Sequence, residues 1–157
     1  MKALIGNFDT RLDSKRRLAI ASGIREQISS ACGENFVLVP DPDPQNGRER
    51  YLWLFPDVYF RSLAASMKRG ALTAEHQLGL ERWIAIAQVI RPDGQGRVVI
   101  PKDSMKGVVV TEELKLSCNG NHIEIWPRDK WDAEYGVQAV LPRNIFDMAS
   151  DGLDFED

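Results

Sequence analysis

An internal repeat constrains the fold of this chain more than any other feature of its sequence. Residues 13–21 and 93–101 share one layout: a polar turn of the form Asp-x-x-x-Arg leads into a short stretch rich in aliphatic residues. The aspartate, the arginine and a later isoleucine recur exactly 80 residues apart, as Asp13/Asp93, Arg17/Arg97 and Ile20/Ile100. A repeat at a fixed offset predicts a duplicated structural unit. A chain of 157 residues is long enough for two small halves that share one core.

A second match extends the repeat to the end of each half. Phe55-Pro56 corresponds to Trp126-Pro127 at the shorter offset of 71 residues. The nine-residue difference is close to the length of a polar segment at 41–50, which holds two prolines and an Asn-Gly pair and is predicted to be an exposed loop. We therefore predict a first half at 1–70, a second half at 71–137 and an acidic tail, without regular structure, at 138–157.

Local patterns predict an α+β protein that is mainly β. The expected strands are residues 3–8, 18–20, 36–39, 51–55, 84–90, 98–100, 114–118 and 122–126, the last two joined by an Asn-Gly-Asn turn. The expected helices are residues 23–30 with Ser22 as cap, 56–70, 73–83 and 127–135, and residues 102–106 are expected to form a short helix or a turn. In the second of these helices, Val58, Leu63 and Met67 are expected to face inward.

Composition excludes several classes of protein. No run of about 18 apolar residues is present, so we expect no membrane span and a cytoplasmic location. Two cysteines, Cys32 and Cys118, make neither a disulfide framework nor a zinc site of the usual spacing. The chain lacks nucleotide-binding and hydrolase motifs, and its two histidines, His76 and His122, are interpreted as structural. We expect no enzyme activity, cofactor or metal.

The charge of the chain is unevenly distributed. The net charge is −3, but residues 11–25 carry five cations against a single acid, whereas residues 129–157 carry eight acids against two cations. Only charges within about 10 Å of a ligand act on it strongly in physiological salt. A basic segment on an acidic protein can therefore still bind a polyanion.

The repeated turn has two interpretations. Asp13 and Asp93 can accept backbone N–H bonds and shape the turn, and Gly94 and Gly96 can supply the positive φ that a turn requires. Each arginine can pair with its aspartate, a purely structural role, or extend its planar fork to a phosphate. Two observations favour binding: the motif occurs twice, and its first copy holds the adjacent cations Lys15, Arg16 and Arg17.

These residues resemble the MraZ family, a branch of the AbrB-like swapped-hairpin regulators. The resemblance rests on Leu12-Asp13-Ser14-Lys15-x-Arg17-Leu18, on Asp93-Gly94-x-Gly96-Arg97-Val98-x-Ile100-Pro101, and on Glu124-Ile125-Trp126 after the hairpin. It covers residues 1–135, with three departures: the family usually has glycine at position 16 and proline at position 21, where this chain has Arg16 and Ala21, and the segment at 41–50 is an unusual insertion.

The resemblance implies a duplicated swapped-hairpin fold of β-barrel halves with peripheral helices. It implies a ring-like homo-oligomer that binds repeated sites in double-stranded promoter DNA upstream of division and cell-wall genes, and hence association with the nucleoid. Its DNA-contacting positions correspond to Lys15 and Arg17, with Arg97 as the second-half equivalent, and Arg16 adds a further cation. The alternative is a protein-interaction module of the same fold that has lost DNA binding. The four tryptophans are interpreted as core or interface residues rather than as stacking platforms for bases.

Overall fold

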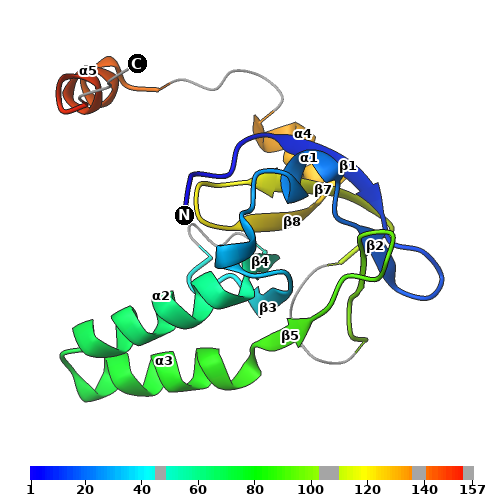
Figure 1. The fold of residues 1–157 in the computed structure, drawn as a ribbon, viewed down its shortest axis with the longest axis horizontal. Coiled ribbons are helices and arrows are strands. Elements are labelled where there is room, and N and C mark those ends of the chain that lie inside the picture. Colours follow the sequence, from blue (N-terminus) through cyan, green and yellow to red (C-terminus); the bar gives the residue numbers. More distant parts are fainter. Residues whose placement is uncertain (45–48, 103–109, 136–140, 154–157) are drawn as a thin grey trace.

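A six-stranded antiparallel sheet organises the protein (Figure 1). The computed structural model describes residues 1–44, 49–102, 110–135 and 141–153. The strand order is β1-β7-β8-β4-β3-β5. A separate two-stranded sheet, here called the ribbon, pairs β2 (Arg17–Ala19) with β6 (Arg97–Val99). The strands of the large sheet are β1 (Asn7–Arg11), β3 (Phe36–Pro40), β4 (Leu52–Pro56), β5 (Gln88–Ile90), β7 (Glu113–Cys118) and β8 (Ile123–Pro127).

The two halves of the repeat exchange strands. β1, from the first half, pairs with β7 of the second, so that Phe8 lies opposite Leu116. β5, from the second half, pairs with β3 of the first, so that Ile90 lies opposite Phe36. When every strand is replaced by its counterpart in the other half (β1 by β5, β3 by β7, β4 by β8 and the reverse), the same strand order is obtained, read from the opposite edge of the sheet. The α+β, mainly β prediction is confirmed, and the six-stranded sheet is open rather than closed among the described residues.

The ribbon covers one face of the large sheet. Leu18 and Val98, opposite one another in the ribbon, are fully buried, as are Ile20 and Ile100 just beyond it. They pack on aliphatic residues of the sheet, including Leu38, Leu54, Leu114, Leu116, Ile123 and Ile125. Full burial of one such side chain contributes about 1.5–3 kcal/mol. The repeated Ile20 and Ile100 are therefore what attaches each turn to the core.

Helices cover the opposite face. Phe55 and Phe60 form a second cluster there with Val37 and Val39, under α2 (Asp57–Gly70) and α3 (Ala74–Ile86). The indole of Trp83 donates to the Pro40 carbonyl at 2.9 Å. On the other half of the sheet, α4 (Arg128–Tyr135) packs on β7 and β8, and Trp131 donates to Ser117 Oγ at 3.0 Å. The described part of the chain contains no helix long and apolar enough to span a bilayer.

A buried carboxylate organises the β7–β8 hairpin. Glu124 accepts hydrogen bonds from Trp126 Nε1 at 2.9 Å and Asn119 Nδ2 at 3.1 Å, and contacts His122 Nε2 at 2.9 Å. Burial raises the pKa of Glu124, but the hydrogen bonds from these three side chains outweigh burial and lower it. The ring of His122 stacks on Trp53, with centroids 3.7 Å apart. The structural interpretation of His122 and the core role of Trp126 agree with this arrangement.

Three helix and strand predictions differ from the structure because packing overrides local pattern. α2 is Asp57–Gly70, within one residue of the predicted range, but Phe60 lies in the core and Val58, predicted to face inward, is 48% exposed. α3 continues to Ile86, so the strand predicted at 84–90 is only Gln88–Ile90. α1 spans Ser22–Arg25 rather than 23–30, because the following amides of Gln27 and Ile28 make tighter i→i−3 bonds.

The two ends of the described chain also differ from prediction. β1 is Asn7–Arg11 rather than 3–8, with its side chains alternating between half-buried and exposed. The tail forms a helix, α5 (Arg143–Asp151), stabilised by an i,i+4 ion pair between Arg143 and Asp147 at 3.0 Å. Its apolar residues Ile145, Phe146 and Met148 are exposed. The tail is therefore not structureless.

Two predicted segments, 41–50 and 102–106, lie partly or mostly outside the described residues. In the segment predicted as an exposed loop at 41–50, residues 45–48 lie outside the described residues, and Asp41 is buried rather than exposed. The carbonyl of Asp41 accepts from Arg50 Nε at 2.7 Å, which closes the base of this segment. The short helix or turn predicted at 102–106 lies almost entirely outside the described residues.

Candidate functional site

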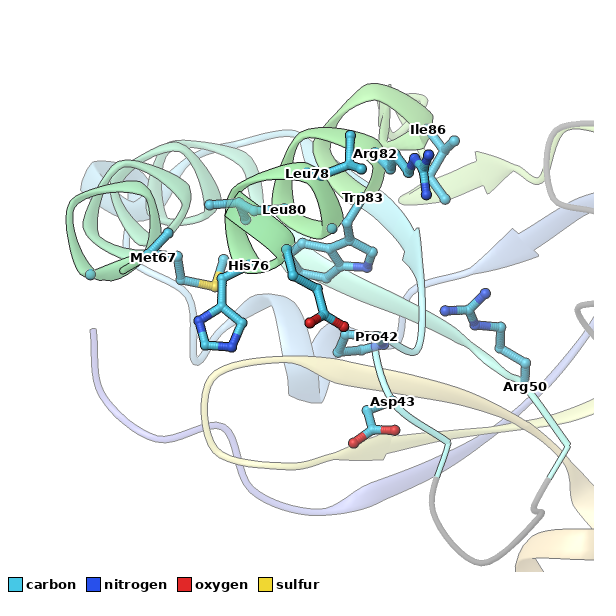
Figure 2. Close-up of a pocket in the computed structure, with 14 residues that line it drawn as sticks. Pro42, Asp43, Arg50, Met67, His76, Leu78, Leu80, Arg82, Trp83 and Ile86 are labelled. Carbon is cyan, nitrogen blue, oxygen red and sulfur yellow. The ribbon is translucent and has the colours of Figure 1, made fainter. Parts of the chain in front are cut away.

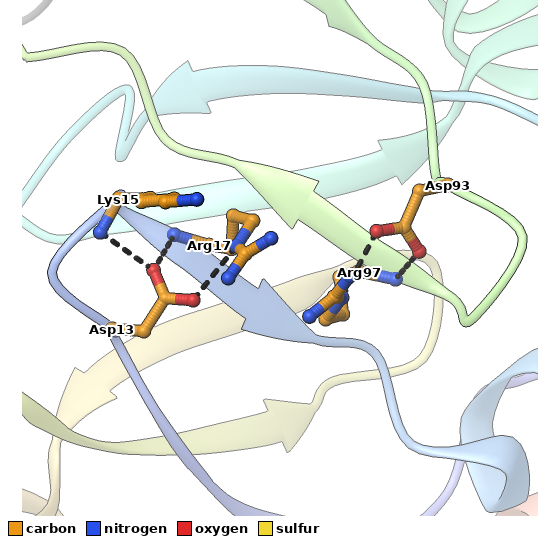
Figure 3. Close-up of polar contacts among 5 residues, drawn as sticks. All are labelled: Asp13, Lys15, Arg17, Asp93 and Arg97. Atoms are coloured by element: carbon orange, nitrogen blue, oxygen red, sulfur yellow. Dashed lines mark hydrogen bonds and ion pairs between the residues drawn. The ribbon is translucent and has the colours of Figure 1, made fainter.

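The two Asp-x-x-x-Arg turns are built from the same hydrogen bonds (Figure 3). In the first turn, Asp13 Oδ1 accepts the backbone N–H groups of Lys15 and Arg17 at 2.9 and 2.8 Å, and Oδ2 accepts Arg17 Nε at 2.8 Å. In the second, Asp93 makes the same three bonds with Gln95 and Arg97, at 2.8, 3.0 and 2.9 Å. The aspartate of each turn is therefore its structural centre, as the sequence predicts.

The register of the ribbon brings the two arginines to one face. Arg17 lies opposite Val99, and Ala19 lies opposite Arg97. Residues two apart in a strand share a face, and directly opposed residues of an antiparallel pair share a face as well. Leu18 and Val98, at the alternate positions, face the core. Arg17 and Arg97 therefore lie on the outer face of the ribbon, near each other.

Both arginines keep hydrogen-bonding capacity toward solvent. Their side chains are 30% and 32% exposed, and each uses Nε for its aspartate. Among the described residues, their terminal guanidinium nitrogens have no protein partner, and neither has Nζ of the exposed Lys15. A carboxylate bound to one edge of a guanidinium fixes its orientation but leaves the N–H donors of the other edge available. A second anion can accept hydrogen bonds from those donors.

Both aspartates are held in the charged form. The pKa of Asp13 is lowered mainly by the backbone N–H of Arg17; partial burial opposes this, and the Arg17 side chain and the Lys15 N–H lower it further. The pKa of Asp93 is lowered in the same way, mainly by the backbone N–H of Arg97. The turns therefore keep their shape at neutral pH.

Arg16 has a structural task besides its charge. Its φ is +60°, in the left-handed region, where its counterpart Gly96 has φ +78°. Its Nε donates to the Ile100 carbonyl at 2.8 Å and its Nη2 approaches the Pro101 carbonyl at 3.4 Å. These bonds offset the cost of a left-handed conformation for a residue with a side chain, roughly 1–2 kcal/mol. Arg16 is thus less available to a ligand than Lys15.

Sequence reasoning missed Arg25, which braces the second turn. Its Nε donates to the Ile20 carbonyl at 3.0 Å, the counterpart of the bond from Arg16 to Ile100. Its guanidinium covers Gly96 so closely that a Cβ there would lie 2.8 Å from Cζ of Arg25. In the sequence, Arg25 is a single arginine at the end of a short helix and belongs to no recognised motif, so its position gave little indication of this role.

Glycine is required at only one of the two predicted positions in the second turn. Gly96 has both the positive φ and the close neighbour. Gly94 does not have a positive φ, contrary to the prediction, and a Cβ there would meet no atom within 4 Å. The reason is that the left-handed residue lies three positions after the aspartate, at the entry to β6.

The two turns differ in charge. The first carries Lys15, Arg16 and Arg17 against Asp13, whereas the second carries Arg97 against Asp93, with Arg25 alongside. The first turn therefore concentrates more positive charge than the second.

A separate groove lies between α3 and the β3–β4 connection (Figure 2). Its volume is about 1130 Å³, and its residues include Met67, Leu78, Trp83 and Ile86 with Arg50 at one side. Leu78 and Ile86 are 46% and 44% exposed. The groove is wide and largely apolar, and the lining residues include one histidine, His76, but no serine, threonine or cysteine.

No candidate metal centre is present in the described ranges, where His, Cys, Asp and Glu nowhere gather in threes. Cys32 and Cys118 are free thiols, and burial raises the pKa of Cys118 to about 11. Such a thiol is protonated and unreactive at neutral pH. The candidate site is therefore the pair of turns on the ribbon.

Fold and turns together define a duplicated swapped-hairpin protein in which each half presents an Asp-x-x-x-Arg turn. Comparison with known proteins agrees. Residues 84–138 match the family model described as "MraZ protein, putative antitoxin-like". The chain is 31% identical over 148 residues to the transcriptional regulator MraZ of Clostridium tetani, covering 94% of this chain and 96% of that protein.

Two further relatives carry the same name. The MraZ of Clostridium acetobutylicum is 28% identical over 148 residues, again 94% of this chain and 96% of the relative. That of Nitrosomonas europaea is 28% identical over 130 residues, 82% of this chain and 84% of the relative. The chain belongs to the MraZ family of transcriptional regulators.

We predict that Gly96→Ala destabilises the protein and Gly94→Ala does not. The first change adds a side chain where φ is +78° and Arg25 occupies the space, so unfolding should need about 1–3 kcal/mol less free energy. The second adds a methyl group to open space. Urea denaturation of both variants measures the difference, and equal stabilities would contradict this account of the turn.

The lowered pKa values of Asp13 and Asp93 predict an acid-dependent stability. Because the folded-state pKa lies below the unfolded value of about 3.9, their contribution is complete above that value and is lost as pH falls through the folded pKa. The double variant Asp13→Asn, Asp93→Asn should therefore lose less stability than the wild type between pH 7 and pH 3. Urea midpoints across this range test it; parallel losses in both proteins would refute it.

Proposed function

We propose that the protein is a DNA-binding transcriptional regulator that grips the phosphates of double-stranded DNA with the outer face of its ribbon. The observation that carries the proposal is the placement of Arg17 and Arg97 on one face, close to Lys15 (Figure 3); among the described residues, their terminal guanidinium nitrogens and the Lys15 ammonium have no protein partner. Phosphate contacts from arginine and lysine supply most of the affinity of such proteins. Arg16 contributes charge while its guanidinium holds the ribbon.

We further propose a ring-like homo-oligomer that binds repeated promoter sites upstream of division and cell-wall genes, at the nucleoid. One ribbon offers few phosphate contacts, so several copies in one assembly would multiply a weak contact by raising its effective concentration. The exposed apolar side chains of α3, Leu78 and Ile86 among them, support a contact between copies. The relatives' shared name, transcriptional regulator, supports the regulatory role.

A protein-interaction module that has lost DNA binding is the second candidate. It is favoured by α5, whose apolar residues Ile145, Phe146 and Met148 are exposed on a helix that makes no extensive contact with the sheet. The experiments below separate the two candidates, because only the first requires the cations of the ribbon.

Charge reversal at Lys15 should strongly weaken DNA binding without harming the fold. Its ammonium contacts no protein group among the described residues, so Lys15→Glu should weaken binding to the protein's own upstream DNA at least tenfold. The slope of log K against log salt should fall by about 0.9 for each protomer that loses a phosphate contact. Fluorescence anisotropy over a salt series measures both quantities.

The matched control is Lys68→Glu, the same charge change on the exposed surface of α2. It should leave affinity and slope unchanged. Arg17→Glu should abolish binding as well, but it also breaks the ion pair with Asp13, so Lys15→Glu is the more decisive variant. Wild-type protein that binds no DNA at low salt would overturn the proposal and favour the interaction module.

Assembly should depend on the apolar surface of α3. We expect the wild type to have a mass in solution that is a multiple of the chain mass, and Leu78→Glu to reduce it, because a charge would then be buried between copies. Gln77→Glu, one residue away and also exposed, is the control. Light scattering after size-exclusion chromatography measures the mass; a monomeric wild type would contradict the ring.

A further inference from the structure

Lys15 and Gln95 occupy the same position in the two turns. Each is the second residue after the aspartate, and each donates its backbone N–H to that aspartate's Oδ1, at 2.9 Å for Lys15 and 2.8 Å for Gln95. Both residues are exposed, and neither side chain makes a hydrogen bond or ion pair with the described part of the protein. One backbone geometry therefore presents two different chemical groups.

The two groups suit different parts of DNA. A lysine ammonium is a compact point charge that pairs with a phosphate. A glutamine amide is uncharged and has a donor and an acceptor side by side, the arrangement that matches N7 and N6 of adenine in the major groove. Gln95 gains little from a phosphate, but it can discriminate between bases.

The second turn is also the slimmer of the two. Gln95 is flanked by Gly94 and Gly96, whereas Lys15 is flanked by Ser14 and Arg16. A Cβ at position 94 would meet nothing within 4 Å, so this side of the turn is open. Glycine lets a backbone approach a ligand closely. The second turn is therefore open beside Gln95 on the Gly94 side, while Arg25 covers the Gly96 side.

The second turn is held rigidly behind that side chain. Asp93 accepts two backbone N–H groups and Arg97 Nε, and the guanidinium of Arg25 packs over Gly96 while it donates to the Ile20 carbonyl at 3.0 Å. Base readout requires donors and acceptors in fixed positions, since a bidentate contact is lost with small displacements. The bracing from Arg25 supplies this fixity.

We infer that the two turns divide the work: Lys15 of the first turn anchors a phosphate, and Gln95 of the second turn reads the edge of an adenine in the major groove. This inference rests on the proposed DNA-binding function and adds to it the residue that determines sequence preference. Arg25 is a positioning residue for this contact, because it acts through the turn and not on the base.

Selection from a randomised duplex library, with wild type, Gln95→Ala and Lys15→Ala, tests the inference. Gln95→Ala should keep the salt slope and the affinity for random DNA, but its preference for adenine at one position of the selected site should fall about 5- to 150-fold. Lys15→Ala should keep the preference and weaken binding to all sequences. Far-ultraviolet circular dichroism with thermal melting confirms that each variant is folded.

A chemical substitution in the DNA gives a second readout. Replacing the preferred adenine by 7-deazaadenine removes the N7 acceptor, so the wild type should bind the modified site more weakly and Gln95→Ala should bind both sites equally. Three results would overturn the inference while leaving DNA binding intact. Gln95→Ala could keep the adenine preference, it could lose affinity equally for all sequences, or both proteins could be equally sensitive to 7-deazaadenine. Absence of DNA binding by the wild type would instead remove the proposed function itself.

Discussion

A single carboxylate in each half determines the shape of the surface on which function depends. Asp13 and Asp93 each gather two backbone amides and one guanidinium, so that a four-residue turn closes and its arginine is directed onto the ribbon. The ribbon in turn is held to the large sheet by the buried Ile20 and Ile100. A change at either aspartate would therefore alter the turn, the arginine and the approach to a ligand at once.

The repeat could be recognised in the sequence because identical residues recur in it at a fixed spacing. Asp13 and Asp93, Arg17 and Arg97, and Ile20 and Ile100 do the same physical work in both halves, so selection of one residue type at each pair left a visible pattern. What a single sequence could not show was the exchange of strands. The pairing of β1 with β7 joins residues more than 100 positions apart, and no local pattern encodes such a partner.

Positions that break the repeat were the hardest to interpret from sequence. Arg16 stands where the second half has Gly96, and the structure shows that its guanidinium donates to Ile100 just as Arg25 donates to Ile20. Each half thus satisfies an equivalent carbonyl with an arginine drawn from a different place in the chain. Backbone propensity alone indicates that an arginine is strained at position 16, whereas the hydrogen bond to the Ile100 carbonyl compensates for this strain. The helix end at Ile86 and the exposure of Val58 were predicted wrongly for the same kind of reason, because packing determines both.

The interlaced sheet also bears on how the chain is made. β1 lies near the N-terminus, yet its partner β7 ends at Cys118 and the neighbouring β8 ends at Pro127. During synthesis, β1 therefore lacks its native neighbour until β7 has left the ribosome. The native six-stranded sheet can be completed only after the chain has been made as far as β8.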